Sequence, residues 1–155
     1  MVVSWFHPSV AIQREGVTGM IEGDEVIRSG DLLWTDFGIT YLRLNTDTQH
    51  LAYVLKPGEK EAPAGLRAGL ANSNRVQDFL RAAFKPGRSG NEALAEARAK
   101  AIAAGLDPSI YSHPIGHHGH GAGPSIGFWD NQQADPRGQG PIRANTAWSI
   151  ELTSY

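Results

Sequence analysis

The chain has no cysteine among its 155 residues. This absence excludes thiolate zinc sites, disulfide frameworks and cysteine nucleophiles, and it leaves the redox compartment open. Any metal must therefore be held by histidine and carboxylate ligands, which suit borderline and hard cations. The length is sufficient for one domain with a core of its own.

Other features are also missing. No apolar run approaches the roughly 18 residues that a membrane span needs. The net charge of −2 and the pI of about 6.3 give no basic surface for nucleic acid. The first residues lack the basic start and the cleavage site of a secretory signal. We therefore expect a cytoplasmic protein that binds neither membranes nor nucleic acids.

Hydrophobic patterning predicts strands, then two helices, then strands again. The expected strands cover residues 5–12, 26–27, 32–40, 46–55, 109–113 and 147–155. The first helix is expected over 63–85. The second begins at a capping box of Ser89 and Glu92 and runs to Ala104, with Gly105 as its C-cap.

This order is typical of an α+β fold in which helices cover one face of a mainly antiparallel sheet. A strand begins almost at the first residue, and the last strand ends without a cap. The sequence therefore predicts a single, partial domain over residues 1–155, truncated at both ends.

Two aspartates, Asp36 and Asp47, lie eleven positions apart in strand-like segments, where aspartate is unusual. A hairpin around Tyr41-Leu42 would place them opposite each other, with Cβ atoms about 4.5–5.5 Å apart. Two such carboxylates repel unless a cation lies between them. The alternative is a buried turn-capping Asp and a solvent-facing Asp. Because the two central residues are poor turn formers, we also expect a longer loop or a bulge near Gly38.

Four of the six histidines fall between residues 113 and 120. His113 ends a strand, and His120 follows seven residues later among glycines, which permit close approach of a ligand. This context favours a binding role for both, although a His/Gly-rich surface loop is the alternative. For His117 and His118 we prefer the surface loop or adventitious metal binding.

Two further residues could belong to a site. Glu151 is the only charge in the last strand and points to the face opposite Ile150 and Leu152. The alternative is a solvent-facing Glu on an edge strand. His7 lies before a proline near the start of the chain, where a core histidine is the simpler interpretation.

These residues, taken in order, resemble the pita-bread metallopeptidases, which include methionine aminopeptidase, aminopeptidase P, prolidase and the metal-free creatinase. The match runs from about His7 to Glu151. The Trp-Phe-His-Pro-Ser-Val segment and the His-Gly-His-Gly-Ala-Gly-Pro run are most similar to bacterial Xaa-Pro aminopeptidase-like members. The resemblance implies a pita-bread fold.

The resemblance also implies a metal site. Asp36 becomes the first carboxylate ligand, Asp47 the bridging one, His113 the imidazole ligand and Glu151 the next carboxylate. The implied cofactors are two divalent ions, and manganese, cobalt, iron and zinc all suit such ligands.

The two remaining histidines receive roles in the reaction. His120 would contact the substrate and the tetrahedral intermediate, and His7 would line the substrate pocket. Gly121 stands where the family usually has a glutamate. The family's fifth ligand, a glutamate on a later strand, is absent from the 155 residues. We therefore expect weak binding of the second metal and no activity from this stretch alone.

The activity implied is hydrolysis of short peptides at the N-terminal residue, at Xaa-Pro bonds, by water activated between two metal ions. The alternative is a pita-bread binding or scaffold protein that has lost catalysis. Metal-free, creatinase-like hydrolysis is disfavoured because both aspartates are present. A homodimer through segments outside this stretch is compatible with the resemblance.

Overall fold

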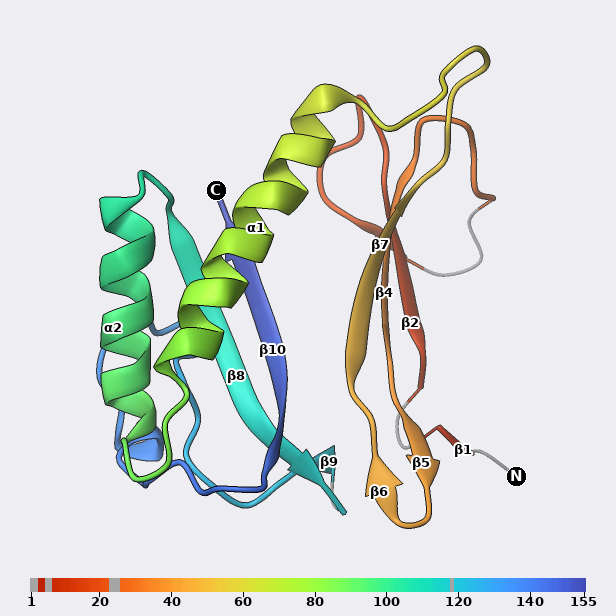
Figure 1. Ribbon diagram of the computed structural model, residues 1–155. Coiled ribbons are helices and arrows are strands. Elements are labelled where there is room, and N and C mark those ends of the chain that lie inside the picture. Colours follow the sequence, from red (N-terminus) through yellow and green to blue (C-terminus); the bar gives the residue numbers. More distant parts are fainter. Residues whose placement is uncertain (1–2, 5–6, 23–25, 118) are drawn as a thin grey trace.

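The computed structural model describes residues 3–4, 7–22, 26–117 and 119–155. The chain forms two halves that lie side by side (Figure 1). The first half contains short antiparallel strands: β1 (Val3–Ser4), β2 (Ser9–Gln13), β3 (Ile21–Glu22), β4 (Leu32–Phe37), β5 (Ile39–Tyr41), β6 (Leu44–Asn45) and β7 (Thr48–Tyr53). The second half contains α1 (Ala64–Ala83), α2 (Gly90–Ala103), β8 (Pro108–Gly116), β9 (Gly119–His120), a 3-10 turn (Pro136–Gly138) and β10 (Ala147–Ser154).

The strands of the first half form a sheet in the order β3-β2-β4-β7, and a smaller sheet in the order β1-β5-β6. The expected hairpin is present, but its turn lies one residue later. Leu42 and Arg43, with φ values of 49° and 64°, occupy its centre. Asp36 therefore pairs with Gln49, and the predicted direct opposition to Asp47 is wrong.

The error in register amounts to two residues along one strand. A slip of two positions keeps each side chain on its face of the sheet, whereas a slip of one would reverse it. Asp36 and Asp47 consequently remain on one face, as diagonal neighbours. The ladder is interrupted between Phe37 and Ile39, but the pairing keeps one register on both sides and a two-residue turn closes the hairpin, so the longer loop or bulge expected near Gly38 is wrong.

Two expected strands of the first half differ from the structure. The strand predicted over 5–12 is β2 alone, since His7 and Pro8 are not in a strand and residues 5–6 lie outside the described residues. The strand predicted at 26–27 is also wrong, because the short strand is β3. The carbonyl of Val26 accepts a hydrogen bond from the Arg14 side chain at 2.9 Å instead of joining a ladder.

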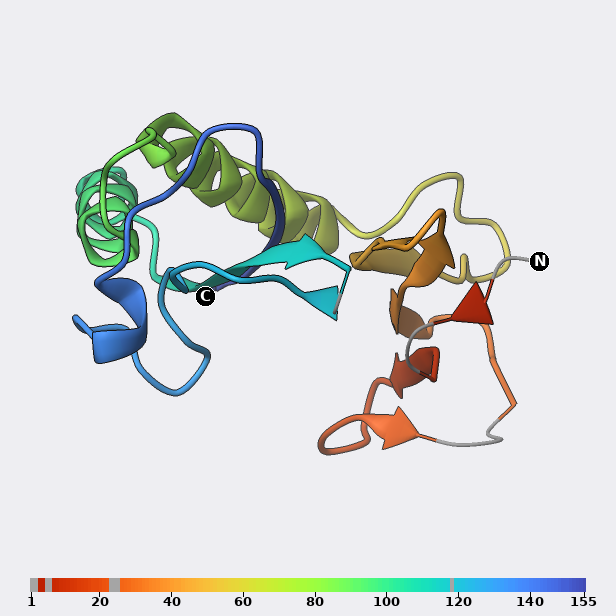
Figure 2. The ribbon, with the colours of Figure 1, turned by 90° about the horizontal axis from the view of Figure 1, so that it is seen from below.

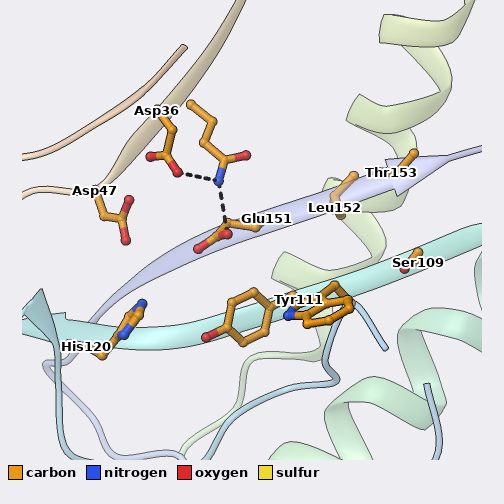
Figure 3. Close-up of a pocket in the computed structure, with 10 residues that line it drawn as sticks. Asp36, Asp47, Ser109, Tyr111, His120, Glu151, Leu152 and Thr153 are labelled. Atoms are coloured by element: carbon orange, nitrogen blue, oxygen red, sulfur yellow. Dashed lines mark hydrogen bonds between the residues drawn. The ribbon is translucent and has the colours of Figure 1, made fainter. Parts of the chain in front are cut away.

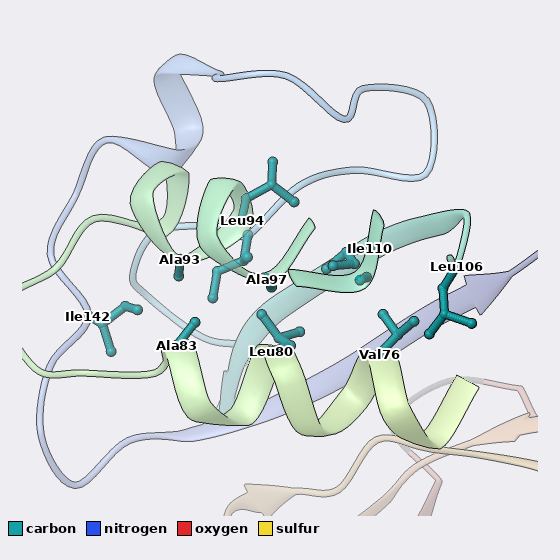
Figure 4. Close-up of a cluster of buried hydrophobic side chains, with 11 residues drawn as sticks. Val76, Leu80, Ala83, Ala93, Leu94, Ala97, Leu106, Ile110 and Ile142 are labelled. Carbon is teal, nitrogen blue, oxygen red and sulfur yellow. The ribbon is translucent and has the colours of Figure 1, made fainter. Parts of the chain in front are cut away.

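The second half holds the main hydrophobic core. Both helices lie on one face of the sheet formed by β10, β8 and β9 (Figure 2). The capping box at Ser89 and Glu92 is confirmed, and Gly105 follows α2 with a φ of 76°. Figure 4 shows the core side chains between the helices and the sheet, including Val76, Leu80, Leu94 and Ile110. Alanines on the buried face of α2 allow α1 to approach closely.

Strand β8 is longer than predicted and extends through His113 to Gly116. It then turns back into β9, which the glycine-rich sequence does not predict. Neither helix of the described chain is long and apolar enough to span a membrane.

A buried ion pair stabilises the start of β4. Asp31 is 1 % exposed and accepts two hydrogen bonds from the Arg14 guanidinium, at 2.8 and 2.9 Å. The backbone N–H of Arg28 donates a third, at 2.7 Å. The hydrogen bonds from Arg14 lower the pKa of Asp31 to about 2, against the opposing effect of burial.

This pair predicts a pH-dependent contribution to stability. Because the pKa of Asp31 is lowered by folding, its contribution is present above about pH 4 and is lost as the pH falls toward 2. Asp31→Asn should therefore lower the urea midpoint at pH 7, and the difference from wild type should shrink between pH 4 and pH 2. Asp78→Asn, which removes an exposed pair with Arg81, should leave the midpoint nearly unchanged. An equal loss of stability at pH 7 and pH 2 would contradict the prediction.

Candidate metal centre

Polar side chains from both halves meet where β4 and β7 face β8 and β10. Asp36 lies near the end of β4, Asp47 just before β7, His113 in β8 and Glu151 in β10. The Nε2 atom of His113 lies 2.8 Å from Glu151 Oε1 and 3.3 Å from Asp47 Oδ2. Figure 3 shows Asp36, Asp47 and Glu151 gathered around one opening. The structure thus brings together the four residues that the sequence predicts as metal ligands.

The alternation of β8 and β10 explains how the site side chains face the cavity. In β8, Ile110 is buried in the helix-covered core, while Tyr111 and His113 point to the other face. In β10, Glu151 pairs with Tyr111 and has Ser149 two residues before it. The Ser149 hydroxyl donates to Glu151 Oε1 at 3.2 Å, which helps to orient the carboxylate.

A hydrogen bond from Nδ1 to the backbone fixes the orientation of the His113 ring. Nδ1 lies 3.0 Å from the carbonyl oxygen of Pro114, so an N–H there donates to the backbone and leaves Nε2 directed at the carboxylates. This tautomer is the one that ligates a metal through Nε2. Burial lowers the pKa of His113, but hydrogen bonds to Asp47 and Glu151 outweigh it and raise the pKa to about 9.

Asp36 carries an unsatisfied atom. Its Oδ1 is one of two buried side-chain polar atoms in the described chain that have no hydrogen-bond partner. Burial, followed by the charges of Asp47 and Glu151, raises the pKa of Asp36 to about 6. A divalent cation would satisfy this oxygen and neutralise the repulsion among the carboxylates. The donor set, with three carboxylates and one imidazole, therefore fits a divalent metal.

The other histidines occupy different positions. His120 on β9 is exposed, and its ring lies edge-on to that of His113 with centroids 4.0 Å apart. One ligand atom from each of Asp47, His113 and His120 lies within 4.8 Å of the others. His120 is therefore within reach of the metal centre, and its substrate role stays a prediction.

His7 is exposed between β1 and β2 and is not among the described residues that line the cavity, so its role also stays a prediction. His117 is exposed, and its backbone carbonyl accepts a hydrogen bond from Asn45 at 3.1 Å. This position agrees with the surface-loop interpretation. His118 lies outside the described residues.

The cavity of about 640 Å³ includes residues that the sequence did not single out. They are Gln49, Ser109, Tyr111, Trp129, Leu152 and Thr153. The Gln49 amide donates to Glu151 Oε2 at 3.0 Å and lies 3.5 Å from Asp36 Oδ2, so it connects two predicted ligands. Strand alternation could have found it, because Gln49 lies two residues after Asp47.

The fold and the site define a class: an α+β pita-bread domain with a cavity lined by carboxylates and imidazoles. A family model for metallopeptidase family M24 matches residues 2–155, and the chain belongs to this family. The family recognised from the residues and the predicted fold class are both confirmed.

Solved structures share the fold at low identity. X-Pro aminopeptidase from Thermotoga maritima has a TM-score of 0.67 and 19 % identity over 97 % of this chain. Prolidase from Thermococcus sibiricus has a TM-score of 0.57 and 19 % identity over 97 % of this chain. The match covers 43 % and 42 % of these two proteins respectively, so the chain spans less than half their length.

The same fold also occurs in a subunit of the FACT complex. The N-terminal domain of the FACT complex subunit SPT16 from chickpea has a TM-score of 0.58 and 14 % identity, over 97 % of this chain and 34 % of that one. No curated protein matches the chain. The shared fold alone therefore assigns no activity to this chain.

The position of Asp47 predicts loss of metal when it is removed. Asp47→Ala in the full-length protein should abolish bound divalent metal, because it deletes the carboxylate that lies against His113 Nε2. Elemental analysis after dialysis measures the metal. Asp107→Ala, at an exposed carboxylate outside the cavity, is the matched control. Unchanged metal content in Asp47→Ala would overturn the ligand assignment.

Protons should compete with the metal at the same atoms. His113, with its pKa near 9, and Asp36, with its pKa near 6, both gain protons as the pH falls. Because the metal must displace the proton on His113, affinity should fall roughly tenfold per pH unit between pH 8 and pH 6. Competition with a chelating dye measures this dependence. An affinity that does not change with pH would show that His113 is not a ligand.

Proposed function

We propose that the chain forms the metal-binding part of an exopeptidase that hydrolyses short peptides at the N-terminal residue, with Xaa-Pro bonds preferred. One observation carries the proposal. Four residues from separate parts of the chain converge on one site, with His113 Nε2 between Asp47 and Glu151 and a buried, unpartnered oxygen on Asp36. A protein that only binds a partner has no need of buried carboxylates that repel one another.

Each residue of the site has a separate role in this proposal. Asp36, Asp47, His113 and Glu151 would hold the divalent metal. Bound metal would supply Lewis-acid activation of water and of the scissile carbonyl. Gln49 holds the carboxylates of Asp36 and Glu151 in a fixed orientation through its amide. His120, exposed beside His113, would donate a hydrogen bond to the substrate where negative charge develops.

The preference for Xaa-Pro bonds is supported by the likeness in fold to an X-Pro aminopeptidase and a prolidase. It is also supported by the open cavity of about 640 Å³, which has room for a short peptide. The exposed edge of His120 allows a peptide to approach from solvent.

The test compares the two neighbouring histidines. The full-length protein should hydrolyse Xaa-Pro peptides when manganese, cobalt, iron or zinc is added. His120→Ala should retain metal and lower turnover by about two orders of magnitude or more, because it removes a donor to the developing charge. His113→Ala should lose the metal together with the activity. Elemental analysis and a peptide-cleavage assay on the same samples separate the two roles.

Two outcomes would change the proposal. Metal loss in both variants would make His120 a ligand instead of a substrate contact. Absence of hydrolysis across the four metals, with metal bound to the wild-type protein, would replace the enzyme by a binding protein of the same fold.

A further inference from the structure

A large aromatic side chain stands open to solvent beside the metal centre. Trp129 is 77 % exposed, and it lines the same cavity as Asp36, Asp47 and Glu151. A single exposed apolar residue needs no explanation by itself. The surroundings of Trp129 are what make its position informative.

Trp129 lies at the tip of a tight turn whose backbone is held in place. The N–H of Phe128 donates to the carbonyl of Asn131 at 2.9 Å, and the N–H of Asn131 donates back at 3.1 Å. The Gln132 amide donates to the carbonyls of Phe128, at 2.5 Å, and Ile110, at 2.8 Å. Its oxygen accepts from the N–H of Ile110 at 2.8 Å. The turn is thus attached to the buried strand β8.

Two neighbours hold the ring of Phe128, the residue before Trp129. Phe128 stacks on Tyr111 with ring centroids 5.5 Å apart, and the Arg137 guanidinium lies 3.4 Å from the centroid of the Phe128 ring. Arg137 is in turn held by two hydrogen bonds to Asp135, at 2.8 and 2.9 Å. The backbone that carries Trp129 is therefore held in place beside the cavity.

The ring contacts extend from Phe128 through Tyr111 to His113 at the candidate metal centre. The ring centroid of Tyr111 lies 5.2 Å from that of His113, and Tyr111 pairs with Glu151 across β8 and β10. In Figure 3, Asp36 and Asp47 lie at one end of the cavity, while Ser109 and Thr153 lie farther along the strands, with Tyr111 between. The cavity therefore has a charged end and an aromatic wall.

We infer that Trp129 and Tyr111 form a subsite for an apolar side chain of the peptide, next to the bond that is cleaved. The inference rests on the proposed function and names its specificity residues. A peptide whose scissile carbonyl lies at the carboxylates would place a neighbouring side chain along this wall. Contact with two aromatic rings favours leucine, phenylalanine or proline over glycine.

The test compares Trp129→Ala with Trp129→Phe in the full-length protein. Peptides with leucine or glycine are compared at each of the two positions that flank the scissile bond. In Trp129→Ala the preference for leucine at one position, measured as a ratio of kcat/KM values, should fall about tenfold or more. Trp129→Phe should retain most of it, and both variants should keep their metal. An unchanged ratio in Trp129→Ala would overturn the inference.

Tyr41→Ala is the matched control, because Tyr41 is an exposed aromatic residue that does not line the cavity. It should leave the ratio unchanged. If the wild-type protein hydrolyses none of the peptides, the proposed function fails. The subsite is then tested separately, by measuring how tightly the protein binds the same peptides. Calorimetry with the same peptides should then show a preference for leucine that Trp129→Ala reduces. Equal affinities of the wild-type protein for both peptides would overturn the inference.

Discussion

The two halves of the chain meet through charged and polar groups, and the rest of the site depends on this contact. Asp47 and Gln49 from the first half reach His113 and Glu151 in the second. Sheets and helices usually meet through apolar side chains, since burying charge costs free energy. Here the imidazole between two carboxylates makes the contact possible, because it gains a proton and balances part of their charge.

The buried apolar side chains of the protein lie mainly in the second half. Nearly all buried apolar side chains of the described residues belong to the helices, to β8 or to the loop before β10. In the first half, Ala11 and Ile12 are the only described apolar residues that are buried. The first half has instead the buried ion pair of Arg14 and Asp31. Its sheet therefore has little apolar core of its own. A cation at the carboxylates would strengthen the contact between the halves by binding to residues of both at once.

The sequence predicts the residues that gather at the candidate metal centre because residue type and order are enough for it. Asp36, Asp47, His113 and Glu151 are each unusual in their local pattern, and an error of two in register leaves the aspartates on one face. Gln49 and Tyr111 could have been found by the same alternation. Strand β9 could not, because the glycine-rich segment has no hydrophobic period. Neither the Arg14–Asp31 pair nor the anchored turn of Trp129 leaves a local signal, since their partners come from other elements.

Strand β8 explains why the metal centre and the aromatic wall lie together. Its inward face places Ile110 in the core against both helices, and its outward face carries Tyr111 and His113. The backbone of Ile110 also anchors the turn of Trp129 through Gln132. A substitution that displaces β8 would therefore move His113 together with Tyr111 and the turn of Trp129. Because the scissile bond and its neighbouring side chain are a fixed distance apart, a shared strand is a simple way to keep their two binding sites in register.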